Sequence, residues 1–343
     1  MHIPFFPIAS ITQGPRQSNF ELLRIVAMFL VLMVHSDFWS LGNPKATDFI
    51  SYPANAFLRT IIESISIVCV NVFILISGWF DIKFSIRGLS NFIFQCIYFL
   101  FGTYAVLLIL GITELSIHRI AECFCLTKSN WFIKSYIGLY ILSPVLNIYV
   151  THATKRVQRI VLIMFFLFQT AYGWSNAAVF IEHGYSTFSF IGLYLLSNYV
   201  RHHHKKLIFK QGGILYILTI AINTFIYYTL TIYHLPGNTY SYVNPFVIIG
   251  ALGILGYFGS LHLKSNKLIN WMAKSSFAVY LFHTNPNIVP MFKSVVVKLY
   301  DSFSGFECIG TISGLLILIF VIAILIDQPR RWLWTLLSKA IFK

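Results

Sequence analysis

Charged residues are scarce in this chain of 343 residues: they make up 10% of it, and Asp and Glu together number only 11. Soluble globular proteins carry about 25% charged residues. The chain is instead 57% hydrophobic and 17% aromatic, with 33 Phe and 19 Tyr. A single soluble core of this size cannot bury so much apolar surface, and disordered chains are poor in aromatic residues. The composition therefore predicts a polytopic membrane protein.

Cysteine is also scarce, and the five cysteines form no framework. Cys69, Cys96 and Cys308 lie in or beside apolar runs. Cys123 and Cys125 are one residue apart, which is too close for an ordinary disulfide and is the wrong spacing for zinc. We interpret all five as packing residues and predict no metal cofactor.

Apolar runs long enough to cross a bilayer, about 20 residues each, recur along the chain. Their short connections leave no room for a separate soluble domain. The sequence therefore predicts one all-α transmembrane domain over residues 1–343, with about ten spanning helices. These helices are expected over residues 21–39, 58–79, 90–113, 131–150, 157–173, 187–201, 213–234, 243–261, 268–288 and 308–327.

The net charge of +14 gives the orientation. With ten spans and a cytoplasmic N-terminus, sixteen basic residues fall on the cytoplasmic side. Five fall on the outer side: Lys45, Arg119, Lys128, Lys293 and Lys298. Because cytoplasmic loops of membrane proteins are enriched in Lys and Arg, both termini are predicted to be cytoplasmic. The positive excess is explained by topology, and we expect a lipid bilayer and no nucleic acid as partner.

Ionisable residues within a bilayer are costly and mark functional sites. Arg24 and His35 are eleven residues apart in the first helix, which places them on one stripe and about 16 Å apart along the axis. The alternative interpretation is that Arg24 reaches the headgroups or pairs with Glu21, and that His35 is an ordinary core histidine.

Further polar residues are expected at the depth of His35, in the outer half of the bundle. Glu63 lies about five residues into the second helix from its outer end, and Asp37 lies at the mouth of the first. The others are Asn130, Trp131, Lys134, Tyr136 and His283. Their convergence at one depth favours a functional site over a scatter of core polar groups.

The stretch from Arg24 through ten apolar residues to His35 resembles a signature of the acyltransferase-3 family of integral membrane acyltransferases, which typically O-acetylates bacterial cell-surface polysaccharides. Four more stretches resemble this family in order along the chain. They are the apolar run ending in Ser77, Gly78 and Trp79, the segment NWFIKSYIGLYILSP from Asn130, the segment FAVYLFH ending at His283, and Asp327-Gln-Pro as a stop after the last helix. Lys83 and Arg87 depart from a tighter Arg-x-x-Arg spacing seen in relatives.

The resemblance implies an O-acetyltransferase of the bacterial inner membrane. Its donor would be acetyl-CoA, reached from the cytoplasm, and its acceptor a hydroxyl of a cell-surface polysaccharide or of a lipid-linked sugar precursor. His35 is the natural general base, with Glu63 or Asp37 bonded to its other ring nitrogen. The remaining assignments are oxyanion or substrate contacts from Asn130, Trp131, Lys134, Tyr136 or His283, and donor binding by Arg24, Lys83 and Arg87.

Three alternatives remain open at this stage. One is a two-step route through an acetyl-His35 intermediate. The second is a transporter or flippase of envelope glycan intermediates, because membrane-embedded His, Glu and Arg also suit proton coupling. The third is a polysaccharide polymerase, although such enzymes usually have a larger outer loop than any here.

Overall fold

The protein is described by a computed structural model that covers residues 16–127, 129–174 and 180–342. These residues are mostly helical and include no β-strand. Lys128, one of the five basic residues predicted on the outer side, and the first fifteen residues of the predicted domain lie outside the described part. The elements are α1 (Ser18–Ser36), α2 (Phe38–Leu41), α3 (Ala46–Ser51), α4 (Pro53–Ser66), α5 (Cys69–Trp79), α6 (Ile86–Ile109), α7 (Ile117–Cys123), α8 (Trp131–His152), α9 (Lys155–Gln169), η1 (Thr170–Trp174), η2 (Glu182–Gly184), α10 (Thr187–His203), α11 (Lys205–Ile232), α12 (Pro245–Ser260), α13 (Lys267–Ala273), α14 (Ser276–His283), α15 (Val289–Ser302) and α16 (Gly305–Ile341).

Seven helices of the described residues are long and apolar enough to cross a membrane. They are Ser18–Leu41, Pro53–Trp79, Ile86–Ile109, Trp131–His152, Lys155–Trp174, Lys205–Ile232 and Gly305–Ile341. The predicted all-α, multi-pass membrane fold is therefore confirmed. The three other predicted spans coincide with the shorter helices α10, α12 and the pair α13–α14, so the count of ten stays a prediction.

Two of the predicted helices are interrupted in the structure. The second is divided into α4 and α5 at Ile67 and Val68, and the ninth into α13 and α14 at Lys274 and Ser275. The second break is at a serine pair in which Ser276 donates its hydroxyl to the carbonyl of Ala273. Side-chain hydrogen bonds of this kind compete with the helical backbone pattern.

The last helix differs from its prediction in the opposite way. Asp327-Gln-Pro was expected to end it, but α16 continues through Pro329 to Ile341. Two side-chain contacts support the helix around the proline. Gln328 donates to the carbonyl of Ile324, and Arg330 forms a double hydrogen bond to Asp327 one turn away.

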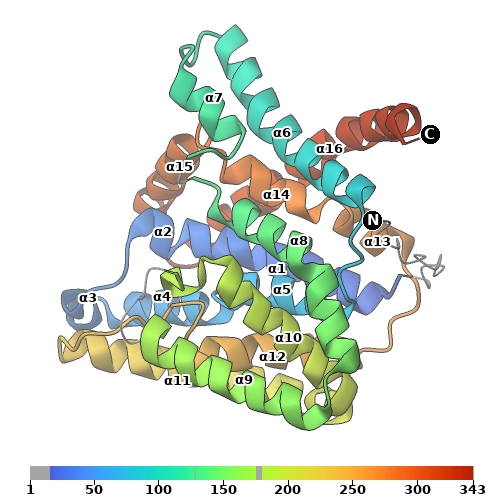
Figure 1. The fold of residues 1–343 in the computed structure, drawn as a ribbon. Coiled ribbons are helices and arrows are strands. Elements are labelled where there is room, and N and C mark those ends of the chain that lie inside the picture. Colours follow the sequence, from blue (N-terminus) through green and yellow to red (C-terminus); the bar gives the residue numbers. More distant parts are fainter. Residues whose placement is uncertain (1–15, 128, 175–179, 343) are drawn as a thin grey trace.

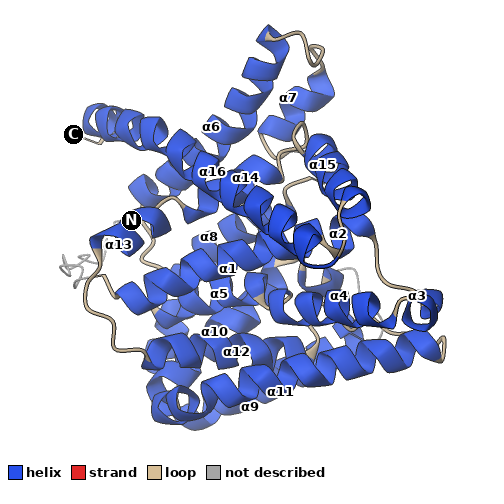
Figure 2. Cartoon of the chain, turned by 180° about the vertical axis from the view of Figure 1, so that it is seen from behind, coloured by secondary structure: helices blue, strands red, loops and turns tan. Residues whose placement is uncertain are grey.

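Helix α1 runs through the middle of the bundle, as Figure 1 shows. It packs against α4, α5, α12, α13 and α14. Its side chains Leu23, Ala27 and Leu32 are fully buried. Seen from behind in Figure 2, α16 crosses on the side of α1 away from α9, α10 and α11. Much of α1 is therefore buried against other helices of the bundle.

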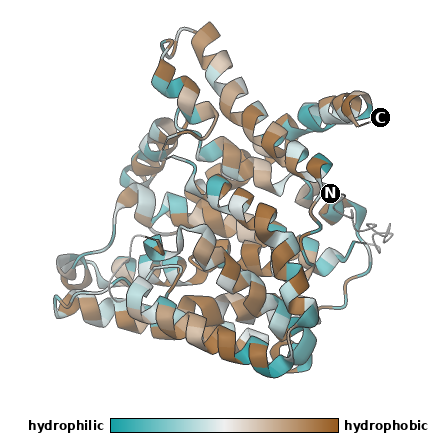
Figure 3. Ribbon diagram, viewed as in Figure 1, coloured by the Kyte–Doolittle hydropathy of each residue, from teal (hydrophilic) through white to brown (hydrophobic). Residues whose placement is uncertain are grey.

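The outer faces of the spanning helices are apolar, as expected for helices in lipid. On α11, Ile214, Ile217 and Phe225 are each about two-thirds exposed. Figure 3 shows hydrophobic residues along α9 and α11, and hydrophilic residues at the turn between α10 and α11. That turn contains the basic tract that begins at Arg201.

Segments predicted to share one side of the membrane meet in the structure. At one end of the bundle, Arg201 binds Asp81, Arg87 binds Ser338, and Ser18 binds Asn270. At the other end, Asn55 donates to Tyr300, Tyr227 donates to the carbonyl of Pro44, and Trp174 donates to that of Asn238. These contacts agree with the predicted alternation of the helices. Which end faces the cytoplasm stays a prediction.

Candidate active site

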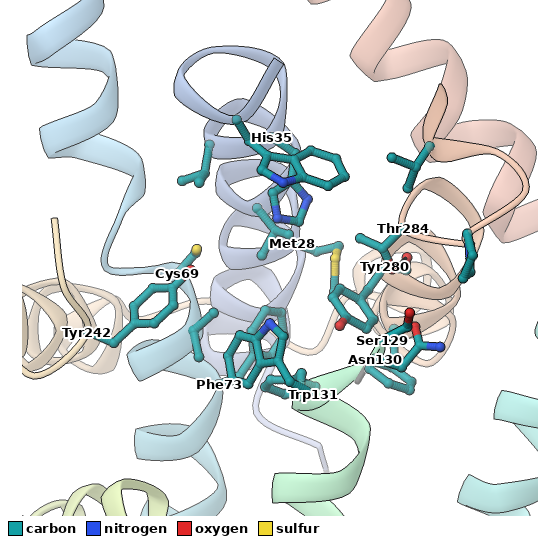
Figure 4. Close-up of a pocket in the computed structure, with 18 of the residues that line it drawn as sticks. Met28, His35, Cys69, Phe73, Ser129, Asn130, Trp131, Tyr242, Tyr280 and Thr284 are labelled. Atoms are coloured by element: carbon teal, nitrogen blue, oxygen red, sulfur yellow. Dashed lines mark hydrogen bonds between the residues drawn. The ribbon is translucent and has the colours of Figure 1, made fainter. Parts of the chain in front are cut away.

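A cavity of about 380 Å³ lies beside the second half of α1. Helix α1 contributes Met28 and His35, and α5 contributes Cys69 and Phe73. Figure 4 shows His35 at one end of the cavity, with Phe73 and Trp131 at the other end and Tyr280 of α14 between them. The lining is mostly aromatic and aliphatic with a few polar groups, which is the composition of a small-molecule site.

His35 forms a pair with His283, the last residue of α14. His35 Nδ1 lies 2.8 Å from His283 Nε2. The other nitrogen of His283, Nδ1, lies 2.6 Å from the carbonyl oxygen of Val279, one turn earlier in the same helix. His283 is fully buried. The segment that begins at the break between α13 and α14 and ends at His283 therefore places a second histidine against the first.

This chain of contacts determines the tautomers of a neutral pair. A carbonyl oxygen accepts only, so His283 Nδ1 carries a hydrogen and donates it to Val279. His283 Nε2 is then an acceptor, and His35 Nδ1 donates to it. The remaining nitrogen of His35, Nε2, is unprotonated, and it has no hydrogen bond within the part of the chain that the structure describes. The arrangement leaves one basic nitrogen in a side chain that lines the cavity.

Asn130 and Trp131 line the same cavity, and their substrate role stays a prediction. Asn130 has a φ of 57°, in the left-handed region, where residues other than glycine are uncommon. It is buried, and its Nδ2 has no hydrogen-bond partner. A buried amide without a partner is costly. The strained backbone and the unpaired donor indicate a residue that is positioned for a ligand.

The carboxylates predicted to orient His35 do not contact it. Asp37 instead binds Arg59, with 2.6 Å between Oδ1 and Nε, and both side chains are largely buried. Glu63 is buried on α4, does not line the His35 cavity, and leaves its Oε2 without a partner. The orienting group of His35 is His283. Neither Glu63 nor Asp37 is therefore bonded to His35 as predicted: Arg59 holds Asp37, and Glu63 lies on α4 outside the cavity lining.

Two of the four predicted substrate contacts lie away from the cavity. Lys134 is exposed, and its ammonium group donates to the carbonyl of Thr127 at 2.6 Å. Tyr136 lies one turn beyond Phe132, on which its ring stacks, and its hydroxyl lies 3.3 Å from that of Ser77. Neither residue lines the cavity.

The three residues predicted to bind the donor lie apart from one another. Arg24 lies in the same continuous helix as His35, as predicted, and pairs with Glu21 at 3.1 Å. Lys83 is exposed in the connection between α5 and α6. Arg87 is exposed on the first turn of α6 and donates to Ser338 of α16.

The sequence analysis counted Lys293 as an outer basic residue but did not place it near the cavity, where it contacts the lining residue Trp39. Lys293 of α15 lies with its Nζ 4.0 Å from the ring centre of Trp39, and the Trp39 ring lies 4.7 Å from that of His35. Burial lowers the pKa of Lys293 below its usual value. Residues 289–307 lie between the ninth and tenth predicted spans, and no helix was predicted there. Pro290 at the second position of a helix was the available signal, because proline is favoured in the first turn.

Gly78 of the Ser-Gly-Trp stretch has a packing role. A Cβ atom at this position would lie 2.4 Å from the backbone oxygen of Tyr194 in α10. Helices α5 and α10 therefore approach more closely here than any larger residue permits, which is a common use of glycine in membrane bundles. The same helix α5 contributes Cys69 and Phe73 to the cavity lining.

The cysteines of the chain are free, and Cys69, Cys96 and Cys123 are buried. Among the described residues there is no group of three or more His, Cys, Asp or Glu side chains that could hold a metal ion.

The fold and the site together define a multi-pass membrane protein with a histidine pair at a buried, aromatic cavity. Over residues 17–327 the chain matches the acyltransferase-3 family model, which is described as an acyltransferase domain. The chain therefore belongs to this family, which confirms the resemblance, and it is a membrane acyltransferase. Comparison with curated proteins and with solved structures gave no match.

Proposed function

We propose that the protein is an O-acetyltransferase of the bacterial inner membrane, which uses cytoplasmic acetyl-CoA and a hydroxyl of a cell-surface polysaccharide or its lipid-linked precursor. The observation that carries this proposal is the His35–His283–Val279 chain of hydrogen bonds. It leaves His35 Nε2 as a base in a side chain that borders a cavity. A sugar hydroxyl is a poor nucleophile until a base removes its proton.

This geometry supports the following proposed reaction. His35 Nε2 takes the proton of the hydroxyl as the hydroxyl oxygen attacks the thioester carbonyl. The C–S bond then breaks, and the imidazolium returns the proton to the leaving thiolate, so that an acetyl ester and free CoA are formed. His283 stabilises the imidazolium through its Nε2 lone pair. The unpaired Nδ2 of Asn130 is the donor proposed for the oxyanion, which needs a hydrogen-bond donor already in place.

The proposed donor must reach this cavity from the other end of α1. Arg24 and His35 lie on one helix about 16 Å apart, a distance comparable with an extended pantetheine arm. A thioester that entered along α1 would bring its acetyl group to His35 while its phosphates stayed near the end of the bundle that contains Arg24.

The test is acetyl transfer by purified protein in liposomes, with labelled acetyl-CoA outside and a glycan acceptor. His35→Gln is expected to lower kcat by about 10²-fold to 10⁴-fold, the usual contribution of a general base. Wild-type transfer by His35→Gln at equal protein level would refute the assignment of the base. Labelled acetate trapped on the protein without acceptor would favour an acetyl-His35 intermediate.

Mass analysis of the surface glycan with and without the gene separates the function classes. Loss of an acetyl-sized mass is expected for the transferase. A change in chain length alone would point to a polymerase, and loss of export would point to a flippase.

A further inference from the structure

A second cavity, of about 490 Å³, lies at the end of the bundle away from His35. Four segments that are far apart in sequence meet there. Arg16 lies just before α1, Asn91 is on α6, Lys274 lies between α13 and α14, and Arg331 and Trp334 are on α16. The proposed reaction assigns no role to this cavity, and of the predicted donor-binding residues none lines it.

The cavity carries an unbalanced positive charge. Arg330 is neutralised by a double hydrogen bond to Asp327. Among the described residues, the side chain of its neighbour Arg331 donates hydrogen bonds to Gln328 and Ser275, which are uncharged. Within the described part of the chain, neither Arg331 nor Lys274 has a carboxylate within ion-pair distance. Two cations in one cavity without carboxylate partners favour binding of phosphate groups.

Arg16 adds to this imbalance. It lies 3.4 Å from Glu21, and the same carboxylate also binds Arg24 at 3.1 Å. One carboxylate therefore serves two guanidinium groups, so this corner of the cavity keeps a net positive charge.

Aromatic side chains stand beside these cations. Trp332 and Trp334 both line the cavity. An indole next to basic groups suits a purine nucleotide, because a nucleobase stacks on an aromatic ring while its phosphates bind the cations. A phospholipid headgroup offers the same phosphate but has no ring to stack.

Helix α14 connects this cavity to the His35 cavity. Lys274 lies three residues before Phe277, which lines the His35 cavity. His283 lies nine residues after Lys274, and the helical part of this segment, Ser276–His283, rises about 11 Å beyond the turn at Lys274. A ligand with its phosphates at Lys274 would therefore need an arm of about this length to bring its acyl group to the histidine pair.

We propose that this cavity binds the adenosine phosphate end of the thioester donor, with Lys274 and Arg331 on the phosphates and an indole on the adenine. The assignment rests on the proposed use of a CoA thioester. It places nucleotide binding at the α13–α14 break and on α16, in contrast to the predicted site at Lys83 and Arg87.

The experiment is calorimetric binding of CoA, without an acyl group, to the full chain in phosphatidylcholine nanodiscs. Lys274→Ala and Arg331→Gln are each expected to weaken CoA binding by about tenfold to a hundredfold, the range for one charge-assisted hydrogen bond. The matched control is Lys267→Ala, because Lys267 is an exposed lysine on the first turn of α13 that does not line the cavity. Since Lys274 is exposed, its variant is expected to fold, and thermal melting checks this.

The outcomes distinguish failure of the proposed nucleotide site from failure of the proposed CoA-dependent reaction. CoA binding that is weakened in both variants but not in the control supports the site. Equal CoA binding by wild type and variants overturns the site and leaves the proposed reaction intact. Loss of CoA binding when phosphatidylglycerol is added to the nanodiscs, with the loss absent in Lys274→Ala, would assign the cavity to a lipid headgroup and overturn it. No CoA binding by any protein would refute the CoA donor itself.

Discussion

His283 is expected to position His35, whereas His35 itself is the proposed base, so substitutions of the two residues should have different effects. It contributes an acceptor to His35 Nδ1, so it acts as a positioning residue. We expect His283→Leu to lower kcat by about tenfold to a hundredfold, as is typical when the partner that orients a metal-bound histidine is removed. In His283→Gln the side-chain carbonyl can accept the same hydrogen, and most of the activity should return.

The measurement is kcat and KM for both variants at saturating donor, with thermal stability as the control. A purely structural role would lower the activity of both variants in proportion to their stability. Equal activity of the Leu and Gln variants would contradict the positioning role of His283.

At the residue scale, the sequence predicted which residues lie at the His35 cavity better than it predicted the hydrogen-bond partner of His35. The spacing of Arg24 and His35 correctly placed both in one helix, and Asn130 and Trp131 do line the cavity. Depth along the helices could not distinguish the neighbours of His35, because Glu63, Asp37 and His283 were all expected at a similar depth. The rotation of each helix about its axis decides which of these side chains faces the His35 ring. This rotation is set by helix packing, which cannot be read from the position of a residue along its helix.

Among the helices, α11 and α12 form a contact that depends on glycine. A Cβ atom at Gly253 would lie 2.8 Å from the backbone oxygen of Gly212 and 2.8 Å from the backbone nitrogen of Tyr216. Backbone atoms cannot yield as a flexible side chain can, so Gly253→Ala forces the two helices apart. We expect it to destabilise the protein by about 1–3 kcal/mol, the usual cost of overpacking.

The measurement is the unfolding midpoint of the detergent-purified protein. Gly314→Ala is the matched control, because Gly314 lies inside α16 with nothing within 4 Å of an added Cβ. Both substitutions gain the same helix propensity over glycine, so any difference between them reports the contact. An equal midpoint for the two variants would show that α11 and α12 are not held at this distance.

Helix existence could be predicted from the sequence, but several helix ends could not. Helix α6 begins at Ile86, four residues before its predicted start, because the Ser85 hydroxyl accepts from the backbone nitrogen of Gly88 and caps the helix. It ends before Gly111, which has a φ of 68°. Hydropathy detects the apolar length that a bilayer requires, whereas caps and turns outside the apolar run set where the helix stops.

At the scale of the whole molecule, the orientation of the protein in the membrane decides which of the two cavities faces the cytoplasm. The His35 cavity and the cationic cavity lie at different levels along α1 and α14. In the predicted positive-inside orientation, the cationic cavity faces the cytoplasm, where CoA thioesters are available, and His35 lies toward the outer side. The reverse orientation would place the cationic cavity where such a donor is absent, so topology and mechanism depend on each other.

Reporter fusions test this orientation. Alkaline phosphatase inserted after Gly237, in the connection between α11 and α12, is expected to be active, because this enzyme folds only outside the cytoplasm. Inserted after Lys264, between α12 and α13, or fused to the C-terminus, it should be inactive, whereas a fluorescent protein at the C-terminus should be bright. Because α12 alone separates the two insertion points, opposite activities would also show that this helix of 16 residues spans the membrane. Activity at both points would contradict that span, and an active C-terminal fusion would contradict the predicted cytoplasmic C-terminus.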